Sequence, residues 1–228
     1  MTAVSAGEEL GSSEHALLRP WLTSLDEQDA AVFLDALARY LELLHRWSRA
    51  YDLVGPKEFG RLVARHVLPS LALATYLNPQ ASLLDVGSGA GFPGLVIALR
   101  DPTRRVVLVE RNGKKARFLD HVARRLNLEH LQVVHDDVRR FQDGPFDVVT
   151  ARAWGSARNL LAASGHLAHE ATVWHLLKGR RGRTEIDALS PAWRPVFAPL
   201  FPAAFGRRED FLLTVVRSNP SPSTGRST

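Results

Sequence analysis

The stretch SLLDVGSGAGFPG, residues 82–94, constrains the fold of this chain more than any other part of it. Its apolar beginning predicts a buried strand. Three alternating glycines, Gly87, Gly89 and Gly91, then predict a sharp turn, because glycine adopts left-handed backbone conformations without steric cost. Pro93 suits the first turn of a following helix, where its missing N–H costs little. Strand, turn and helix together are typical of the first βα unit of a doubly wound sheet, which is a place where nucleotide-like ligands bind.

Two classes of cofactor fit this turn. The spacing Gly89-x-Gly91-x-x-Gly94 matches the fingerprint of NAD- and FAD-binding proteins. The overlapping spacing Asp85-x-Gly87-x-Gly89-x-Gly91 favours S-adenosylmethionine, because a carboxylate there would repel a pyrophosphate and attract an ammonium or sulfonium cation. We therefore expect S-adenosylmethionine, with a dinucleotide as the alternative.

Composition bounds the protein class. The chain has 228 residues, 45% of them hydrophobic, which predicts one domain with an extension or two small domains. It has no cysteine, which excludes disulfides, thiolate zinc sites and catalysis by an attacking thiolate. The scattered histidines predict no metal site. We expect a cytoplasmic protein, because neither a signal peptide nor a bilayer-spanning apolar run is recognisable. The net charge of +5 indicates an anionic partner.

Alternating strand and helix patterns predict an α/β fold with a mostly parallel sheet of seven strands. We expect a disordered N-terminus at 1–14, a helical N-terminal cap at 15–78, the sheet domain at 79–217 and a disordered tail at 218–228. Within the cap, Ser24-x-x-Glu27 reads as a capping box at the start of a helix. An apolar stripe follows it at helical spacing, and a second helix is predicted at about 57–77. The stripe consists of Phe33, Leu37, Tyr40, Leu44 and Trp47.

Polar side chains follow three of the predicted strands. Glu110 ends the second strand, where an acid would accept hydrogen bonds from ribose hydroxyls. Asp137 and Val138 follow the third strand and could meet an adenine, although a helix-capping Asp is an equally good interpretation. Arg152 follows the fourth strand and is predicted to hold an anion such as the methionine carboxylate.

The methyl acceptor is less constrained. The fourth strand lacks the Asn/Asp-Pro-Pro-Tyr element that holds exocyclic amines, and no obvious general base follows it. An acceptor with a free lone pair, such as N7 of guanine, would need only alignment with the methyl group. We therefore predict positioning in place of acid–base catalysis, and we assign no catalytic residue.

Basic residues indicate RNA as the anionic partner. The segment 178–183 contains four cations separated by glycines and reads as a loop that contacts phosphates. The predicted RNA-binding residues are Arg65, His66, Lys114, Arg117, Lys178 and Arg181.

Several motifs resemble those of the bacterial ribosomal RNA small subunit methyltransferase G family, also called glucose-inhibited division protein B. They are DVGSGAGFPG, GKKARFL, PFDVVTARAW and LLKG. The resemblance implies a class I, Rossmann-like methyltransferase fold with a helical N-terminal cap. It also implies methyl transfer from S-adenosylmethionine to guanine-N7 in 16S rRNA near the decoding site. We expect a monomer that acts on the rRNA or on the small ribosomal subunit. Carried over by position, the cofactor contacts are Gly87, Phe92, Val138, Arg139 and Arg152.

The chain departs from the family pattern in its cap. The usual Trp-Asn-x-x-x-Asn-Leu-Thr has Ser48 and Asp52 at its amide positions, and the usual Arg-His-x-x-Asp-Ser has Pro69. After the third strand, the usual Ala-Glu pair is Val138-Arg139. A methyltransferase for another RNA or a small molecule therefore stays open, as does a non-catalytic RNA-binding protein with a vestigial cofactor pocket.

Overall fold

A seven-stranded sheet forms the centre of the computed structural model, which describes residues 10–202 and 209–218. Its strand order is β3-β2-β1-β4-β5-β7-β6. All pairings among β1 to β5 are parallel, and β7 is antiparallel to both β5 and β6. This confirms the predicted sheet, closed by a hairpin. The strands are β1 (Leu83–Val86), β2 (Val106–Val109), β3 (Leu131–Val134), β4 (Phe146–Arg152), β5 (Ala168–Lys178), β6 (Trp193–Pro199) and β7 (Phe211–Arg217).

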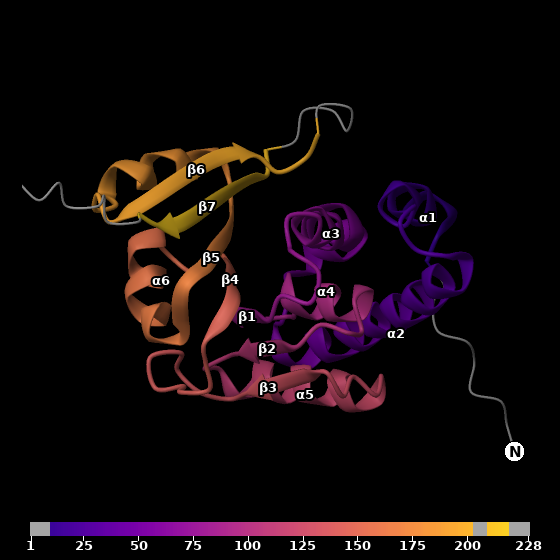
Figure 1. Ribbon diagram of the computed structural model, residues 1–228. Coiled ribbons are helices and arrows are strands. Elements are labelled where there is room, and N and C mark those ends of the chain that lie inside the picture. The colour runs from indigo at the N-terminus through magenta and orange to yellow at the C-terminus, as the bar shows by residue number, and fades with distance from the viewer. Residues whose placement is uncertain (1–9, 203–208, 219–228) are drawn as a thin grey trace, which may run out of the picture.

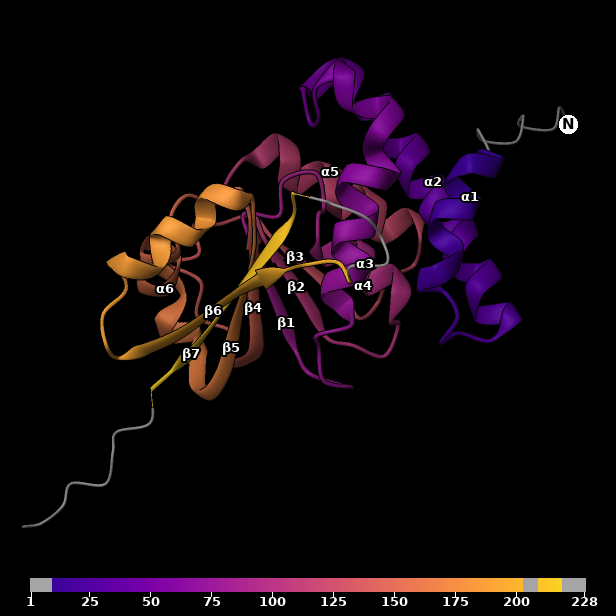
Figure 2. The same ribbon diagram turned by 90° about the horizontal axis from the view of Figure 1, so that it is seen from above.

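Helices cover both faces of this sheet (Figure 1). One face carries α3 (Leu68–Ala74), α4 (Gly94–Arg100) and α5 (Gly113–Arg125), and the other carries α6 (Ala157–Ser164). Both views place α1 (Ser12–Leu18) and α2 (Glu27–Tyr51) on the side away from α6 (Figure 2). The shorter turns are η1 (Arg19–Trp21), η2 (Pro56–Arg61), η3 (Val63–Val67), η4 (Gly165–Leu167) and η5 (Arg180–Ala188).

Alternation along the strands divides the core in two. Leu83 and its partner Val106 pack in the core beneath α4 and α5, while Leu84 and its partner Val107 pack beneath α6. Successive strand residues point to opposite faces, so each inner strand is apolar on both sides. The register therefore brings the carboxyl ends of β1, β2 and β4 to one edge of the sheet.

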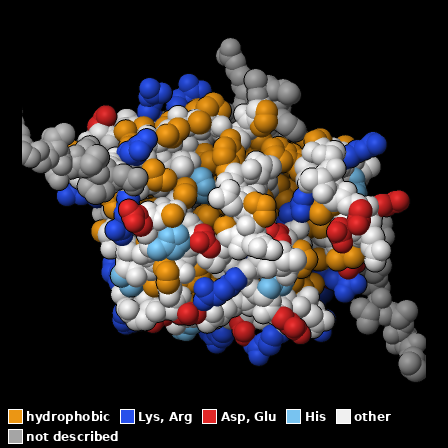
Figure 3. Space-filling view, in the orientation of Figure 1, with side chains coloured by type: hydrophobic (Ala, Val, Ile, Leu, Met, Phe, Trp, Pro, Cys, Tyr) orange, Lys and Arg blue, Asp and Glu red, His pale blue; other side chains and the backbone are white. Residues whose placement is uncertain are grey.

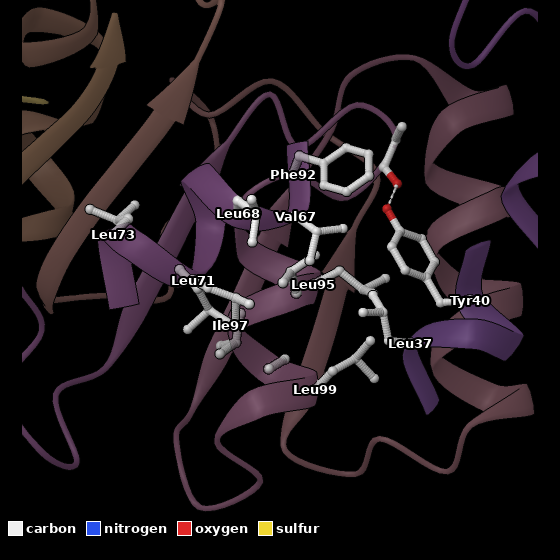
Figure 4. Packing of buried hydrophobic residues seen from close by; sticks show 14 of the residues in the cluster. Leu37, Tyr40, Val67, Leu68, Leu71, Leu73, Phe92, Leu95, Ile97 and Leu99 are labelled. Atoms are coloured by element: carbon white, nitrogen blue, oxygen red, sulfur yellow. Dashed lines mark hydrogen bonds between the residues drawn. The ribbon is translucent and has the colours of Figure 1, made fainter. Parts of the chain in front are cut away.

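The cap shares its core with the sheet domain. Phe33, Leu37, Tyr40 and Leu44 are buried, in agreement with the predicted stripe, and Trp47 is half-buried against the ring of Phe118. Figure 4 shows side chains of α2, η3, α3 and α4 interleaved in one cluster. The predicted division at 78/79 is thus a division of the sequence, and the two parts bury one continuous apolar cluster.

Three local predictions about the cap differ from the structure. Helix α2 begins after Asp26, whose carboxylate accepts a hydrogen bond from the Asp29 N–H at 2.7 Å, so Ser24 is not the cap. The second helix is broken into η2, η3 and α3. Helix α1 begins at Ser12, inside the segment predicted to be disordered. Residues 1–9 and 219–228, which hold most of the predicted disorder, lie outside the described residues.

Within residues 10–202 and 209–218, no helix is both long and apolar enough to cross a membrane.

Candidate active site

The glycine turn after β1 has the predicted left-handed backbone. Gly87, Gly89 and Gly91 have φ values of 69°, 59° and 110°. At Gly87 a side chain is also excluded by contact, because a Cβ there would lie 2.5 Å from Cδ1 of Trp154. Only glycine meets both conditions at this position.

Asp85 lies beneath this turn. Its side chain is fully buried, and one carboxylate oxygen accepts a 3.0 Å hydrogen bond from the N–H of Gly94, the first residue of α4. The other oxygen, Oδ1, has no hydrogen-bond partner among the described residues. Burial raises the pKa of Asp85 to about 7. Asp85 therefore holds the turn against the start of α4 and does not line the cavity described next.

A cavity of about 440 Å³, the first cavity, opens at the carboxyl ends of β1, β2 and β3. It brings together five of the nine predicted cofactor residues, which are Gly87, Glu110, Asp137, Val138 and Arg139. Residues that were not predicted as cofactor contacts also line it, among them Arg111, Lys115, Trp154 and Asn159. The position agrees with the general rule for open α/β sheets, in which ligands bind beyond the strand ends.

Glu110 connects the turn to the end of β2. It is 6% exposed, and its two oxygens accept hydrogen bonds from the N–H of Gly89 at 2.9 Å and of Asn112 at 2.7 Å. Each carboxylate oxygen has a further lone pair, so Glu110 can still accept hydrogen bonds from a ligand in the first cavity. Gly89 is thus fixed by its hydrogen bond to Glu110 and does not itself line the cavity.

The Asp137 carboxylate is engaged by its own segment. It accepts hydrogen bonds from the backbone N–H of Arg139 at 3.0 Å and from the Arg139 guanidinium. The backbone bond is the main reason why the pKa of Asp137 is lowered. Arg139 in turn lies over the Trp154 ring, with its guanidinium carbon 5.8 Å from the centroid. Arg139 and Trp154 therefore form one wall of the first cavity, and buried Val138 offers an apolar surface beside it.

Arg152 lies in a second cavity, of about 700 Å³, at the carboxyl ends of β4 and β5. One of its terminal nitrogens, Nη2, donates a 2.7 Å hydrogen bond to the carbonyl oxygen of Arg65 in η3. The other, Nη1, is buried and has no partner among the described residues. Burial lowers the pKa of the Arg152 guanidinium. Ala153 lines both cavities, so the second cavity adjoins the first.

Phe92 and His66 pack together between the turn and the cap. Phe92 is buried, and its ring stacks on His66 at 4.9 Å between centroids. The Nε2 atom of His66 is 3.0 Å from the Glu58 carboxylate, yet burial lowers the pKa of His66 to about 4. His66 is therefore neutral at pH 7, so the RNA contact predicted for it, which stays a prediction, would not be a charge contact.

The other predicted RNA contacts are dispersed. Arg65 and Lys178 line the second cavity, while Lys114 and Arg117 lie on α5 and line neither cavity. Lys178 is committed within the protein, because its Nζ donates to the Gly155 carbonyl at 2.6 Å and to Glu185 at 3.0 Å. Arg181 is exposed. On the face shown in Figure 3, Lys and Arg side chains alternate with Asp and Glu around the outline.

Two residues that position the site were not predicted for that role. Trp154 was visible in the ARAW motif but carried no assigned function, and Tyr40 was read only as part of an apolar stripe. The Tyr40 hydroxyl donates a hydrogen bond to the Ala90 carbonyl inside the glycine turn (Figure 4). No local sequence signal links residues 40 and 90.

Comparison with known proteins identifies the family. The family model described as rRNA small subunit methyltransferase G matches residues 34–196. A protein of that name from Halorhodospira halophila is 43% identical over 159 residues, which cover 70% of this chain and 76% of the relative. Another from Pseudomonas aeruginosa is 38% identical over 172 residues, covering 73% and 80%. This chain belongs to the rRNA small subunit methyltransferase G family. The resemblance inferred from its motifs is confirmed.

Solved structures confirm the fold of this family member as that of class I methyltransferases. A cofactor-bound protein from MTB, Rv0187, has a TM-score of 0.60 at 18% identity and covers 92% of this chain and 100% of its own. A precorrin-6y C5,15-methyltransferase from Geobacter metallireducens has a TM-score of 0.50 at 13% identity, covering 74% and 92%. The order 3-2-1-4-5-7-6 with an antiparallel β7 is therefore the expected class I, Rossmann-like sheet.

Proposed function

We propose that this protein transfers a methyl group from S-adenosylmethionine to N7 of a guanine in 16S rRNA near the decoding site. The observation that carries the proposal is the first cavity, where the left-handed Gly87 backbone, the buried Glu110 carboxylate and Val138 meet at the strand ends. Membership of the rRNA small subunit methyltransferase G family supports the same reaction and the same substrate.

The residues present fit the cofactor. S-adenosylmethionine supplies a methyl group that is activated by a positively charged sulfur. Glu110 retains acceptor capacity for ribose hydroxyls, and Val138 offers an apolar surface for an adenine ring. Gly87 leaves its backbone open to close approach. Lys115 and Arg111 line the same cavity and can donate hydrogen bonds to the carboxylate of the cofactor, which is the role predicted for Arg152.

Four predicted cofactor residues act from outside the first cavity in this proposal. Asp85 and Gly89 hold the shape of the turn, through the N–H of Gly94 and the carboxylate of Glu110. Phe92 anchors the turn against His66 of the cap. Arg152 stands at the junction with the second cavity. Asp85, Gly89 and Phe92 thereby position the backbone that the cofactor would meet.

The chemistry asked of the protein is alignment. N7 of guanine has a free lone pair at neutral pH, so no proton has to be removed before attack. Holding the two reactants in line supplies the rate enhancement by proximity and orientation. We further propose that the enzyme acts as a cytoplasmic monomer on 16S rRNA or on the assembled small subunit.

Calorimetric titration and a methylation assay test this function. Purified protein is expected to bind S-adenosylmethionine and to transfer a labelled methyl group to small subunits or to naked 16S rRNA lacking the modification. Mass spectrometry of the rRNA nucleosides then identifies the product as 7-methylguanosine. Binding without transfer to either substrate would favour another acceptor, and RNA binding without cofactor binding would favour a vestigial pocket.

A further inference from the structure

The end of helix α2 and the start of helix α5 form an aromatic surface that the binding of a methyl donor does not use. The two helices pack against each other (Figures 1 and 2). Trp47 and Tyr51 are four residues apart on α2, and α5 carries Lys114, Phe118 and His121 at spacings of four and three. Residues at these spacings share one face of a helix, so two stripes of side chains meet here.

Trp47 is the centre of this aromatic surface. Its ring centroid lies 5.3 Å from that of Tyr51, 5.7 Å from that of Phe118 and 5.2 Å from that of His121. Phe118 is fully buried, and Trp47 and His121 are half-buried. Tyr51 is 40% exposed. Trp47 is therefore fixed by its neighbours, and it supports a Tyr51 ring that reaches solvent.

The α5 side of the Tyr51 ring is cationic. The Nζ atom of Lys114 lies over the ring, 5.9 Å from its centroid, which is near the outer limit of a cation–π contact. Lys114 and Arg117 are both exposed, and neither has a carboxylate partner among the described residues, since Arg117 donates only to the Gly113 carbonyl. Asp52 adds an exposed negative charge at the end of α2. The attraction for an anion therefore comes from α5.

The aromatic surface is next to the first cavity but not part of it. Lys115 lines the first cavity, whereas Lys114, its neighbour in the first turn of α5, lies against Tyr51. Neither Trp47 nor Tyr51 lines the first or the second cavity. A nucleotide held at Tyr51 would therefore be a different one from the guanine that meets the methyl donor.

We propose that the exposed ring of Tyr51 stacks on a single-stranded base of the substrate RNA other than the methylated guanine, while Lys114 and Arg117 contact its phosphates. Aromatic rings and cations act together in this way where proteins bind single strands. Every base has a π-face, so the contact holds the strand without reading its sequence. This inference rests on the proposed function, because the RNA is the substrate named there.

Variants at position 51 separate stacking from packing. Tyr51→Leu keeps apolar bulk against Trp47 but has no π-face, whereas Tyr51→Phe keeps the ring and loses only the hydroxyl. The Kd is measured for unmodified 16S rRNA, free or in small subunits, whichever the wild-type protein methylates. We expect Tyr51→Leu to raise this Kd about tenfold and Tyr51→Phe to leave it within about twofold of wild type.

Salt dependence gives a second signature. Stacking neutralises no phosphate, so Tyr51→Leu should keep the wild-type slope of log affinity for RNA against log salt. Lys114→Ala should reduce that slope by about one, because a phosphate contact is lost. A slope reduced as much in Tyr51→Leu as in Lys114→Ala would overturn the stacking contact.

The matched control is Tyr76→Leu. Tyr76 is also an exposed tyrosine, at 46%, and lines neither cavity, so this variant should keep the wild-type Kd for RNA. All variants should keep the wild-type Kd for S-adenosylmethionine, which shows that the protein is folded.

Two results would overturn the inference and leave the methyltransferase function intact. One is a Kd for RNA in Tyr51→Leu equal to that of wild type. The other is a Kd raised equally in Tyr51→Leu and Tyr51→Phe, since the ring would then not be what binds the base. A wild-type protein that methylates neither form of 16S rRNA would instead remove the proposed function, and this inference with it.

Discussion

The hydroxyl of Tyr40 donates a 2.7 Å hydrogen bond to the carbonyl oxygen of Ala90. Tyr40 is fully buried in α2 of the cap, and Ala90 lies between the second and third glycines of the turn. The same hydroxyl would be 3.1 Å from a Cβ at Gly91. The cap therefore fixes the backbone of the candidate cofactor site directly.

Removing this hydroxyl should loosen the turn. In Tyr40→Phe the Ala90 carbonyl remains buried without its donor, which costs about 1–3 kcal/mol. We expect a lower melting temperature and a several-fold higher Kd for S-adenosylmethionine by calorimetry. Tyr51→Phe, on the same helix but 40% exposed, is the control and should change neither. An unchanged Kd in Tyr40→Phe would show that the turn keeps its shape without the cap.

A position can require glycine because of its backbone conformation or because a Cβ would clash with a neighbour, and comparing Gly87 with Gly155 distinguishes the two reasons. Both have positive φ, 69° and 74°, but a Cβ at Gly87 would strike Trp154, whereas one at Gly155 would meet nothing within 4 Å. The free energy of unfolding of Gly155→Ala should therefore fall only by the cost of placing a residue with a Cβ in the left-handed conformation, about 1–2 kcal/mol. Gly87→Ala should lose more stability and also abolish binding of S-adenosylmethionine. Equal losses in denaturant unfolding would show that Trp154 moves aside freely.

Asp85 should make stability depend on pH. Its pKa is about 7 in the folded protein against 3.8 when unperturbed, so between these values the folded protein holds a proton that the unfolded chain has released. The stabilisation is complete below about pH 4 and is lost as the pH rises through 7. Each pKa unit of the shift corresponds to about 1.4 kcal/mol, so the stability lost between these two pH values is up to about 4 kcal/mol.

The variant Asp85→Asn, neutral at every pH, isolates this effect. Its unfolding free energy in urea should rise relative to wild type as the pH increases from about 5 to 8. The matched variant Asp187→Asn, at an exposed position, should keep a constant difference from wild type. A difference between Asp85→Asn and wild type that did not change with pH would place the carboxyl in a polar environment.

Lys178 and Arg181 should separate folding from RNA binding. Lys178 is only 12% exposed and is held by Gly155 and Glu185, so Lys178→Ala should lower the melting temperature. Arg181→Ala should leave stability unchanged and reduce the slope of log affinity for 16S rRNA against log salt by about one per lost phosphate contact. Melting temperatures of the two variants, together with RNA binding at several salt concentrations, distinguish the structural role of Lys178 from the RNA-binding role of Arg181. The assignment of Arg181 would fail if its loss left that slope unchanged.

The sequence predicted those parts of the site that depend on neighbouring residues. The glycines of the turn, the strands on each side and the acid at Glu110 follow from short patterns with a clear physical basis. The contacts that decide how Asp85 and Lys178 act could not be predicted in this way. Whether Asp85 faces a cavity or the start of α4 depends on packing. The two partners of Lys178 are Gly155, which follows β4, and Glu185 of η5, and only the folded chain brings them to the end of β5. The second cavity joins η3 to β7, which are more than a hundred residues apart in sequence.

The sharing of one apolar cluster by the cap and the sheet domain has a consequence for biosynthesis. The apolar stripe of α2, complete by Tyr51, packs against α4 and α5, whose residues extend to Arg125. During translation α2 emerges long before these surfaces exist. Its hydrophobic face cannot pack against α4 and α5 until more than half of the protein has been made, so the glycine turn acquires its final support late in synthesis.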